Sequence, residues 1–389
     1  MQGILVLSLA GIVCGCATSL RTILPGPVGD GIRRPVTPTR IRVALKTSVP
    51  SATVKVVGPG ILYDNIRHRT LRRFATLAST TFSVGTDGAV AMNGVSLKTG
   101  RLVIIPDAVG SLWINDARYR GKAEIIARGP GSQAVVNTLG LEEYLLGVVP
   151  KETFPSWPKA ALRTQAVAAR SFAIHHYHHN SKKDYDIIAP AHQLYGGMSA
   201  ETPSTTKAIF DTEGQYLAYK GAPLCTFFYS CCGGKTEEAA NIFPDVSAYP
   251  PAVDLNYCQG TPHYAWTYSV ALDLCAEKLK RDGKPLNGAI KKVAIINRFK
   301  SGRVGLVRFS SDTGQVDCSG EECRRILGYN NLKSTLFKIR IRSGRLQFSG
   351  RGWGHGVGMC QWGSKGMADK GYSYEAILTQ YYPGAELKK

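Results

Sequence analysis

One carboxylate, Glu152, lies in a proline-rich turn where acid–base chemistry is possible. The surrounding segment reads GVVPKETFPSWP, so we predict an apolar strand that ends at a proline, then a turn whose backbone is fixed by Pro155 and Pro158. A carboxyl group between this apolar run and the rings of Phe154 and Trp157 would have a raised pKa, as a general acid needs near neutral pH. The alternative is an ordinary surface glutamate in a turn.

A helix is predicted directly after this turn, at about residues 158–179. The segment is rich in alanine, and apolar residues recur at the spacing of a buried helix face: Leu162, Ala166, Ala169 and Ala173. Arg163 and Arg170 lie two turns apart, which is about 10 Å along the helix axis. Two guanidinium groups placed in this way could bind an extended anionic or hydroxylated ligand. The alternative is two solvated arginines on the polar face.

A second candidate site lies in the glycine-rich segment GRGWGHGVG at residues 350–358. Glycine at every second position removes the side chains from one face of an extended chain, so that a ligand or another backbone can approach closely. His355 lies inside this segment, and Gln361 follows it. The alternative is a bulged strand or a tight loop without a ligand.

Four histidines near the end of the predicted helix form pairs with helical spacing that could bind zinc: His175, His176, His178 and His179. Without a fixed third ligand, such a cluster is usually the polar end of a helix, where histidines complement the helix dipole. We therefore expect no required metal or other cofactor.

Charge and composition narrow the classes of partner. The 389 residues carry a formal net charge of +20, which favours a polyanionic partner such as cell-wall material, a membrane surface or nucleic acid. No zinc-finger spacing, lysine tail or RNA-binding aromatic motif is present, so we expect no nucleic acid. Hydrophobic residues at 44% and charged residues at 20% indicate a globular protein.

The N-terminus predicts export. Residues 4–13 form an apolar run of about the length of a signal-peptide core, too short to span a bilayer. Small residues then lead to Cys16, as in a bacterial lipoprotein signal that ends in an acylated cysteine. The stretch MQGILV contains no Lys or Arg before the apolar run. An uncleaved anchor or a buried strand therefore stays an alternative.

The cysteine count suggests disulfides in an exported protein. Ten cysteines are present, and eight remain after Cys14 and Cys16 are set aside. Cys318 and Cys323, in a polar turn, are the expected local pair. The alternative is buried free thiols.

The order of the expected elements predicts an α+β fold that is mixed and strand-rich. Residues 17–40 are rich in proline and glycine and indicate a tether, and residues 41–140 alternate as strands do. Beyond the long helix that follows the Glu152 turn, shorter helices are expected at about 271–281, 322–327, 362–370 and 374–382, the last with Ser373 as its N-cap. Strands and helices do not alternate regularly, which disfavours a doubly wound sheet.

Several segments, in order along the chain, resemble the stage II sporulation protein D family. They are LEEYLLGVVPKE, ALRTQAVAARSFA, HQLYGG, YSCCGGKTEE and GRGWGHGVGMCQWGSKGMADKGYSYEAILTQYYPG. The resemblance covers about residues 41–387. After the signal segment at 1–16 and the tether at 17–40, it implies a β-rich part at 41–140 and a catalytic core with a substrate cleft at 141–389.

The resemblance implies a peptidoglycan lytic transglycosylase that cleaves the MurNAc-β-1,4-GlcNAc bond of denuded glycan strands and leaves 1,6-anhydro-MurNAc ends. Glu152 would be its single general acid and base, because the muramoyl 6-hydroxyl replaces the activated water of other glycosidases. The partners would be glycan strands, and amidases or other wall-remodelling proteins, in the cell envelope. Cys16 would carry a lipid anchor. Expected substrate-binding residues are Arg163, Arg170, Tyr229, Lys235, Thr236, His355 and Gln361.

Three alternatives follow from the same residues. Some family members bind zinc just before a Gln-x-Tyr motif; here Gln193-Leu194-Tyr195 is preceded by Asp186 and His192 but by no nearby cysteine, so zinc is not favoured. Related amidase enhancers suggest a non-catalytic wall-binding protein. A cysteine hydrolase would use Cys231 or Cys232 with His355.

Overall fold

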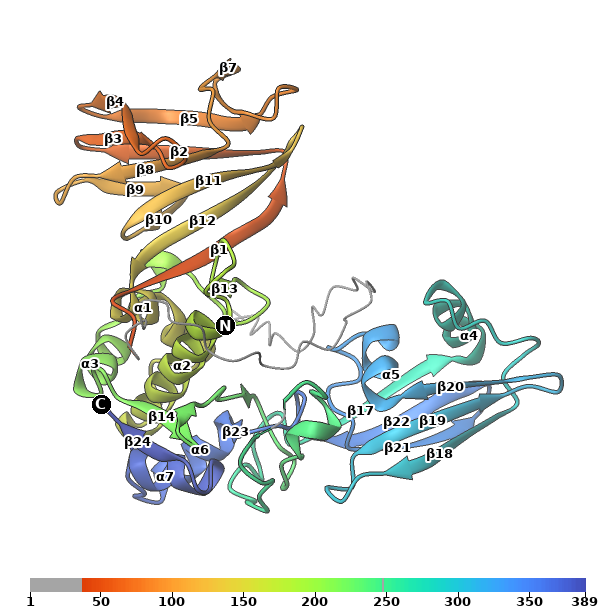
Figure 1. Ribbon diagram of the computed structural model, residues 1–389. Helices are drawn as coiled ribbons and strands as arrows, with labels where there is room; N and C mark the ends of the chain where they lie inside the picture. Colours follow the sequence, from red (N-terminus) through yellow and green to blue (C-terminus); the bar gives the residue numbers. More distant parts are fainter. Residues whose placement is uncertain (1–36, 247) are drawn as a thin grey trace. The chain divides into compact units, whose positions relative to one another are not determined.

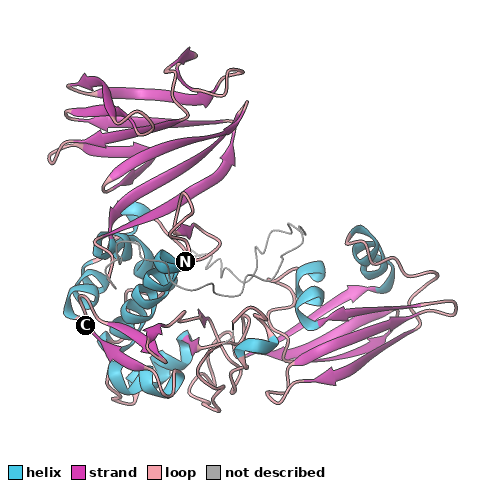
Figure 2. Cartoon of the chain, in the orientation of Figure 1, coloured by secondary structure: helices cyan, strands magenta, loops and turns pink. Residues whose placement is uncertain are grey.

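The computed structural model describes residues 37–246 and 248–389. The signal segment, the lipidation candidate Cys16 and nearly all of the expected tether lie outside these residues. The described chain forms two compact units. We call residues 37–155 and 169–214 the N-terminal unit, and residues 156–168 and 215–389 the C-terminal unit. Strands and helices alternate irregularly in both (Figure 2), which confirms the predicted α+β class.

Two sheets build most of the N-terminal unit (Figure 1). The seven-stranded sheet has the order β13 (Ile187–Ile188), β1 (Arg40–Val49), β12 (Ser132–Gly140), β11 (Lys122–Gly129), β8 (Arg101–Pro106), β3 (Gly60–Asp64) and β4 (Arg69–Phe74). The six-stranded sheet has the order β10 (Ala117–Tyr119), β9 (Ser111–Ile114), β2 (Ser51–Val57), β5 (Leu77–Val84), β6 (Val90–Met92) and β7 (Val95–Ser96).

Both sheets contribute to one hydrophobic core. Val54, Phe82 and Ile114 come from the six-stranded sheet, and Leu102 and Ile125 come from the seven-stranded sheet; all five are buried in the same cluster. Alternate residues of β2 point into this core, as the period of two in the sequence predicts. The strand-rich character expected for residues 41–140 is therefore present.

The segment before Glu152 is a helix, not the predicted strand. α1 (Leu141–Glu152) begins after Gly140, whose N–H donates to Glu143 Oε2 at 2.9 Å, and it contains Pro150 in its last turn. Its buried residues Tyr144, Leu145, Val148 and Val149 fall on the i, i+1, i+4, i+5 spacing of a helix face. Proline at the end of the helix interrupts few backbone bonds, so packing of this apolar face outweighs its helix-breaking effect.

Helices follow α1 in the predicted positions and at one place that the sequence did not predict. α2 (Lys159–His179) matches the long helix that we expected, and the division between the two units falls within it. The short 3-10 turn η1 (Gly197–Ala200) and α3 (Pro203–Asp211), which we did not predict, complete the N-terminal unit.

Four small sheets and four α-helices form the C-terminal unit. The sheets pair β15 (Ala222–Pro223), β14 (Tyr216–Tyr219) and β24 (Glu386–Lys388); β16 (Phe228–Tyr229) and β23 (Met359–Cys360); β17 (Ala265–Ala271), β22 (Arg345–Arg351) and β21 (Phe337–Arg342); and β18 (Lys292–Arg298), β19 (Val304–Ser310) and β20 (Gln315–Ser319). The helices are α4 (Leu272–Arg281), α5 (Gly320–Leu327), α6 (Gln361–Asp369) and α7 (Tyr374–Tyr381), with a 3-10 turn η2 (Ala239–Asn241).

The four shorter helices lie where the sequence predicted them. Ser373 caps α7 as expected, because its hydroxyl accepts a hydrogen bond from the Ala376 N–H at 3.3 Å. The expected boundary at residue 141 coincides with the change from β12 to α1, but the compact units divide the chain elsewhere. In the described part of the chain, no helix has the length and apolar character needed to cross a membrane.

Candidate acid–base site

Glu152 is the last residue of α1 and is half-buried in the N-terminal unit. Its Oε1 accepts a hydrogen bond from the backbone N–H of Leu194 at 2.6 Å. Burial raises the pKa of Glu152 to about 7, while the Leu194 hydrogen bond and the charge of Lys151 act in the opposite direction. This pKa agrees with the raised value that we expected from the sequence, and it leaves the carboxyl group able both to give and to take a proton near neutral pH.

The segment Gln193-Leu194-Tyr195 is held against α1 by side chains on both sides of Leu194. The Tyr144 hydroxyl donates to Gln193 Oε1 at 3.0 Å, and the Tyr195 hydroxyl donates to Asn137 Oδ1 at 2.9 Å. The rings of Tyr144 and Tyr195 lie 5.1 Å apart. These contacts fix the Leu194 N–H that binds Glu152.

A glycine on α1 makes this close approach possible. The Gly196 N–H donates to the Gly147 carbonyl at 3.0 Å, and a Cβ at Gly147 would lie only 2.6 Å from Tyr195 Cε2. A larger residue at position 147 would therefore push the Gln193–Tyr195 segment away from the helix.

A pocket of about 400 Å³ lies beside Glu152, since two of its lining residues are Lys151 and Leu194. Its remaining wall is formed by Leu45, Lys46, Ile114, Asn115, Tyr119, Ala189, Pro190 and Tyr195. Two lysines, two tyrosines and several apolar side chains offer hydrogen bonds, positive charge and flat surfaces. This combination suits a hydroxylated ligand that carries an anionic group.

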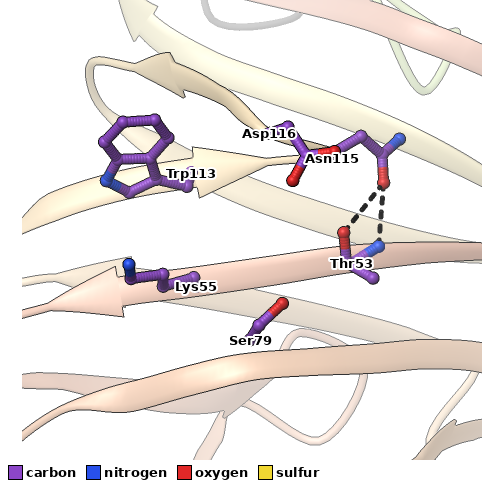
Figure 3. A pocket seen from close by; sticks show the side chains of 6 residues that line it. All are labelled: Thr53, Lys55, Ser79, Trp113, Asn115 and Asp116. Atoms are coloured by element: carbon purple, nitrogen blue, oxygen red, sulfur yellow. Dashed lines mark hydrogen bonds between the residues drawn. The ribbon is translucent and has the colours of Figure 1, made fainter.

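A second hollow of about 270 Å³ shares Asn115 with this pocket. Figure 3 shows the indole of Trp113, with Lys55 on the neighbouring strand, and Asn115, whose Oδ1 accepts from the Thr53 N–H at 2.8 Å. Ser79 and Asp116 complete its wall. An open aromatic face with polar neighbours is suited to binding, not to bond cleavage.

Contrary to our expectation from the sequence, Arg170 does not offer its guanidinium group to a ligand. Its guanidinium is fully buried and holds Glu142 through two parallel hydrogen bonds, Nε to Oε1 at 2.7 Å and Nη2 to Oε2 at 2.6 Å. Nη2 also donates to the Ile209 carbonyl at 3.1 Å. Arg170 therefore ties α1, α2 and α3 together, because a buried guanidinium needs this pairing.

Arg163 lies in the part of α2 that belongs to the C-terminal unit, whereas Arg170 lies in the part that belongs to the N-terminal unit. The Arg163 side chain is half-buried, and its charge lowers the pKa of Glu375 at the start of α7, although desolvation is the largest influence on that group. The charge of Lys151 lowers the pKa of Glu152, but by less than burial raises it.

Glu142 and Glu143 do not supply a second catalytic carboxylate. They lie at the opposite end of α1 from Glu152, about 15 Å along the helix axis. Glu142 is bound by Arg170, and Glu143 accepts from the Gly140 N–H. Glu152 thus stands apart from the two carboxylates that lie nearest in sequence.

His355 lies in the C-terminal unit with both ring nitrogens engaged by the backbone. Nδ1 accepts from the Val357 N–H at 3.1 Å, so Nε2 carries the proton and donates to the Phe228 carbonyl at 3.1 Å. Burial, with a smaller effect of Arg324, lowers the pKa of His355 to about 3. The imidazole is therefore neutral and already paired, which does not fit the expectation that it binds substrate directly.

The other expected contacts in this unit are mostly internal. Tyr229 is buried, with its ring 5.1 Å from that of His355. Thr236 is buried and exchanges hydrogen bonds with the backbone of Val253. Gln361 is buried and donates to Gln165 Oε1 at 3.4 Å. Lys235 alone in this group is partly exposed, and its Nζ lies 3.9 Å from Asp254 Oδ2.

The helix histidines are stacked. The rings of His175 and His179 lie 3.9 Å apart with an interplanar angle of 23°, and those of His176 and His192 lie 4.5 Å apart. Nitrogen lone pairs lie in the ring plane, so stacked rings do not direct them at one ion. Among the described residues, the side chains that lie close enough together to hold a metal ion are three cysteines of the C-terminal unit: Cys231, Cys258 and Cys360.

The expected disulfide between Cys318 and Cys323 is not formed. Both thiols are buried and free, as are the other six cysteines of the described chain, and Cys318 and Cys323 instead share a hydrogen bond. The cysteine hydrolase alternative also loses support. A hydrogen bond with Cys258, together with burial, raises the pKa of the Cys231 thiol to about 12, and His355 is occupied by the backbone.

Sequence reasoning identified Glu152 but missed the groups that define its surroundings. The Leu194 N–H, Lys46, Asn115 and Tyr119 reach the site only through the fold. One signal was available for Leu194, since it lies inside the Gln-x-Tyr motif quoted above. No local pattern pointed to the convergence of the cysteines.

Two protein-family models match segments of this chain. A family model described as Stage II sporulation protein matches residues 130–219, the part that contains Glu152 and Leu194. A second model, described as a domain of unknown function, matches residues 253–358.

Three curated relatives illustrate the similarity. An uncharacterised protein of Brachyspira hyodysenteriae is 29% identical over 89% of this chain and 92% of its own length. The amidase enhancer of Bacillus subtilis is 29% identical over 62% of this chain, although the match spans only 40% of that protein. Stage II sporulation protein D of Bacillus subtilis is 27% identical over 65% of this chain and 76% of its own length. This chain is thus similar to the SpoIID family, whose model matches the segment that contains Glu152.

Proposed function

We propose that this protein is a peptidoglycan lytic transglycosylase with Glu152 as its general acid and base. The observation that carries the proposal is the pKa of Glu152, raised by burial to about 7, next to Lys151 and Leu194, which line a pocket of about 400 Å³. A carboxyl group with this pKa is protonated at mildly acidic and neutral pH, as protonation of a glycosidic oxygen requires.

The separation of Glu152 from Glu142 and Glu143 favours a one-carboxylate mechanism. The Glu152 proton passes to the oxygen that leaves with N-acetylglucosamine, and the bond from C1 of N-acetylmuramic acid to that oxygen breaks. The carboxylate then takes the proton of the muramoyl 6-hydroxyl, whose oxygen bonds to C1 and forms the 1,6-anhydro ring. Glu152 ends the cycle protonated, and no water is consumed.

The pocket residues support a glycan strand without stem peptides. In such a strand the lactyl group of muramic acid ends in a free carboxylate, and Lys46 and Lys151 supply positive charge at the pocket wall. The indole of Trp113, in the hollow that shares Asn115, would stack on a neighbouring sugar ring. Arg163 and Lys235, which are not fully buried, stay proposed contacts of the C-terminal unit.

The relatives support a role in the cell envelope and also supply the alternative. One relative is named as an amidase enhancer, so a wall-binding protein that stimulates an amidase without cleaving glycan is the second candidate. The net charge of +20 suits an anionic wall under either function. Export with a lipid anchor at Cys16 is part of the proposal, as is association with amidases or other wall-remodelling proteins.

Product analysis separates the two functions. The purified chain is incubated with denuded glycan strands, and the fragments are identified by mass spectrometry. The proposal predicts fragments that end in 1,6-anhydro-MurNAc, each one water lighter than a hydrolysis product. Intact strands, together with faster peptide release by an added amidase, would establish the enhancer function instead.

A further inference from the structure

Four buried cysteines from three separate segments of the C-terminal unit converge at one point. The Sγ atoms of Cys231, Cys258 and Cys360 all lie within 4.8 Å of one another. The fourth sulfur, that of Cys232, lies 3.4 Å from Cys258 Sγ. Cys231 and Cys232 follow β16, Cys258 lies in the loop before β17, and Cys360 ends β23. We infer that these four cysteines form a structural Zn²⁺ site.

The sulfur spacing fits a single tetrahedral ion. Four thiolates at about 2.3 Å from Zn²⁺ lie about 3.8 Å from one another. The sulfurs of Cys232 and Cys258 lie 3.4 Å apart, and those of Cys231, Cys258 and Cys360 lie within 4.8 Å of one another. An iron–sulfur cluster would need room for several metal and sulfide atoms between the same sulfurs. Zinc also prefers thiolate ligands in closed, four-coordinate structural sites.

Backbone N–H groups point at the sulfurs, as they do around metal-bound thiolates. Cys360 Sγ accepts from the N–H groups of Cys232 at 3.1 Å and Gly363 at 3.2 Å. Cys232 Sγ accepts from the Gly234 N–H at 3.3 Å. Such donors orient thiolates and disperse their negative charge, which is the usual task of groups behind metal ligands.

A buried cation next to the cluster gives an independent indication of negative charge. Arg303 is fully buried, and its Nη2 donates to the carbonyl of Cys232 at 2.9 Å. Its Nε and Nη1 have no hydrogen-bond partner among the described residues. An isolated buried guanidinium is costly. Four thiolates around one Zn²⁺ carry a net charge of about −2, which would offset that of Arg303.

The metal would hold the glycine-rich segment in place. The Cys231 backbone exchanges hydrogen bonds with Trp353, N to O at 3.0 Å and O to N at 2.7 Å, so the cluster connects residues 231–232 with residues 350–360. The site has four protein ligands and no open position, which indicates a structural role. This inference replaces our expectation from the sequence that no metal is required, and it does not depend on glycan cleavage.

Metal analysis of the full chain tests the inference. The protein is purified without chelators, and its zinc content is measured by elemental (inductively coupled plasma) mass spectrometry. We expect about one Zn²⁺ per chain. Cys258→Ala and Cys360→Ala should lose the metal, whereas Cys225→Ala, which removes a buried cysteine of the same unit outside the cluster, should keep it.

Replacing zinc by Co²⁺ in the unaltered chain covers the case in which the cysteine variants do not fold. A tetrahedral thiolate site should give intense visible and sulfur-to-cobalt charge-transfer absorption, which Zn²⁺ abolishes by competition. The inference is overturned by four free thiols without metal, by iron with acid-labile sulfide, or by a disulfide that makes the intact chain two hydrogens lighter.

Discussion

At the scale of single residues, the main feature is Glu152, because its surroundings shift the pKa of its carboxyl group in opposite directions. Burial raises the pKa of Glu152, while the Leu194 N–H and the charge of Lys151 lower it, and the result is about 7. Much stronger burial would prevent the carboxylate from forming, and a paired arginine would prevent protonation at neutral pH. An intermediate pKa serves both halves of a reaction in which one group gives and later takes a proton.

The raised pKa predicts how stability changes with pH. The folded-state pKa of about 7 lies above the ordinary value of 4.5, so ionisation opposes folding as the pH rises through this interval. Glu152→Gln removes the free-energy cost of ionising this carboxyl group in the folded protein. It should therefore raise the free energy of unfolding by about 1–3 kcal/mol at pH 8 and leave it unchanged at pH 4. Urea unfolding at the two pH values measures the difference.

Glu213→Gln is the matched control, since Glu213 is an exposed glutamate of the same unit. It should leave the free energy of unfolding unchanged at both pH values. An equal effect of Glu152→Gln at pH 4 and pH 8 would show that Glu152 has an ordinary pKa.

At the scale of elements, the site depends on the contact between α1 and the segment that carries Leu194. Gly147 allows this contact, because a Cβ there would meet the Tyr195 ring at 2.6 Å and the Gly197 N atom at 3.1 Å. Gly147 has no side chain that could take part in acid–base chemistry, yet it controls the position of the Leu194 N–H that binds Glu152.

Gly147→Ala should therefore lower glycan cleavage about tenfold or more, because it shifts the Leu194 N–H and changes the pKa of Glu152. The cleavage rate is measured as a function of pH, together with the thermal midpoint. Gly100→Ala is the control, since a Cβ there meets only Ile66 Cδ1 at an ordinary 3.5 Å. Unchanged cleavage by Gly147→Ala, with the same pH dependence, would contradict this role of the glycine.

The elements also show what local sequence could predict. α2, α4, α6 and α7 were predicted within a few residues, because their apolar spacing and stop signals are local. α1 was missed because Pro150 and the run GVV suggested a strand, although Leu141, Tyr144 and Val148 have helical spacing. Packing of that buried face decided the outcome.

Long-range contacts explain the errors at the site. Glu152 was found from its own neighbourhood, but its hydrogen-bond donor, Leu194, lies 42 positions further along the chain. Arg170 was expected at a ligand because nothing in its local sequence shows that Glu142 lies beside it. The four cysteines are likewise brought together by the fold, so their spacing in sequence gave no zinc pattern.

At the scale of the whole molecule, the chain has two compact units with different tasks. The N-terminal unit contains Glu152 and the two hollows. The C-terminal unit contains the glycine-rich segment and the sulfur cluster. The proposed acid–base residue and the proposed zinc site therefore lie in different units, so glycan cleavage and metal content are measured separately.

Attachment to the envelope is the prediction that concerns the entire chain. If Cys16 is lipidated after export, the protein should sediment with membranes, and Cys16→Ser should move it to the soluble fraction or leave its precursor uncleaved. Cell fractionation followed by mass analysis of the N-terminus measures both. Cys225→Ser, at a buried position, is the control. Unmodified Cys16 in membrane-bound protein would contradict lipidation.

The pH dependence of glycan cleavage by matched variants tests the central claim most directly. The unaltered chain should produce 1,6-anhydro ends at a rate that falls as the pH rises above about 7, where Glu152 loses its proton. Glu152→Gln should lower this rate by about 10²–10⁴-fold, while Glu213→Gln retains it. Cleavage by Glu152→Gln at close to the normal rate, or loss of activity already above about pH 5, would contradict a raised-pKa acid at this position.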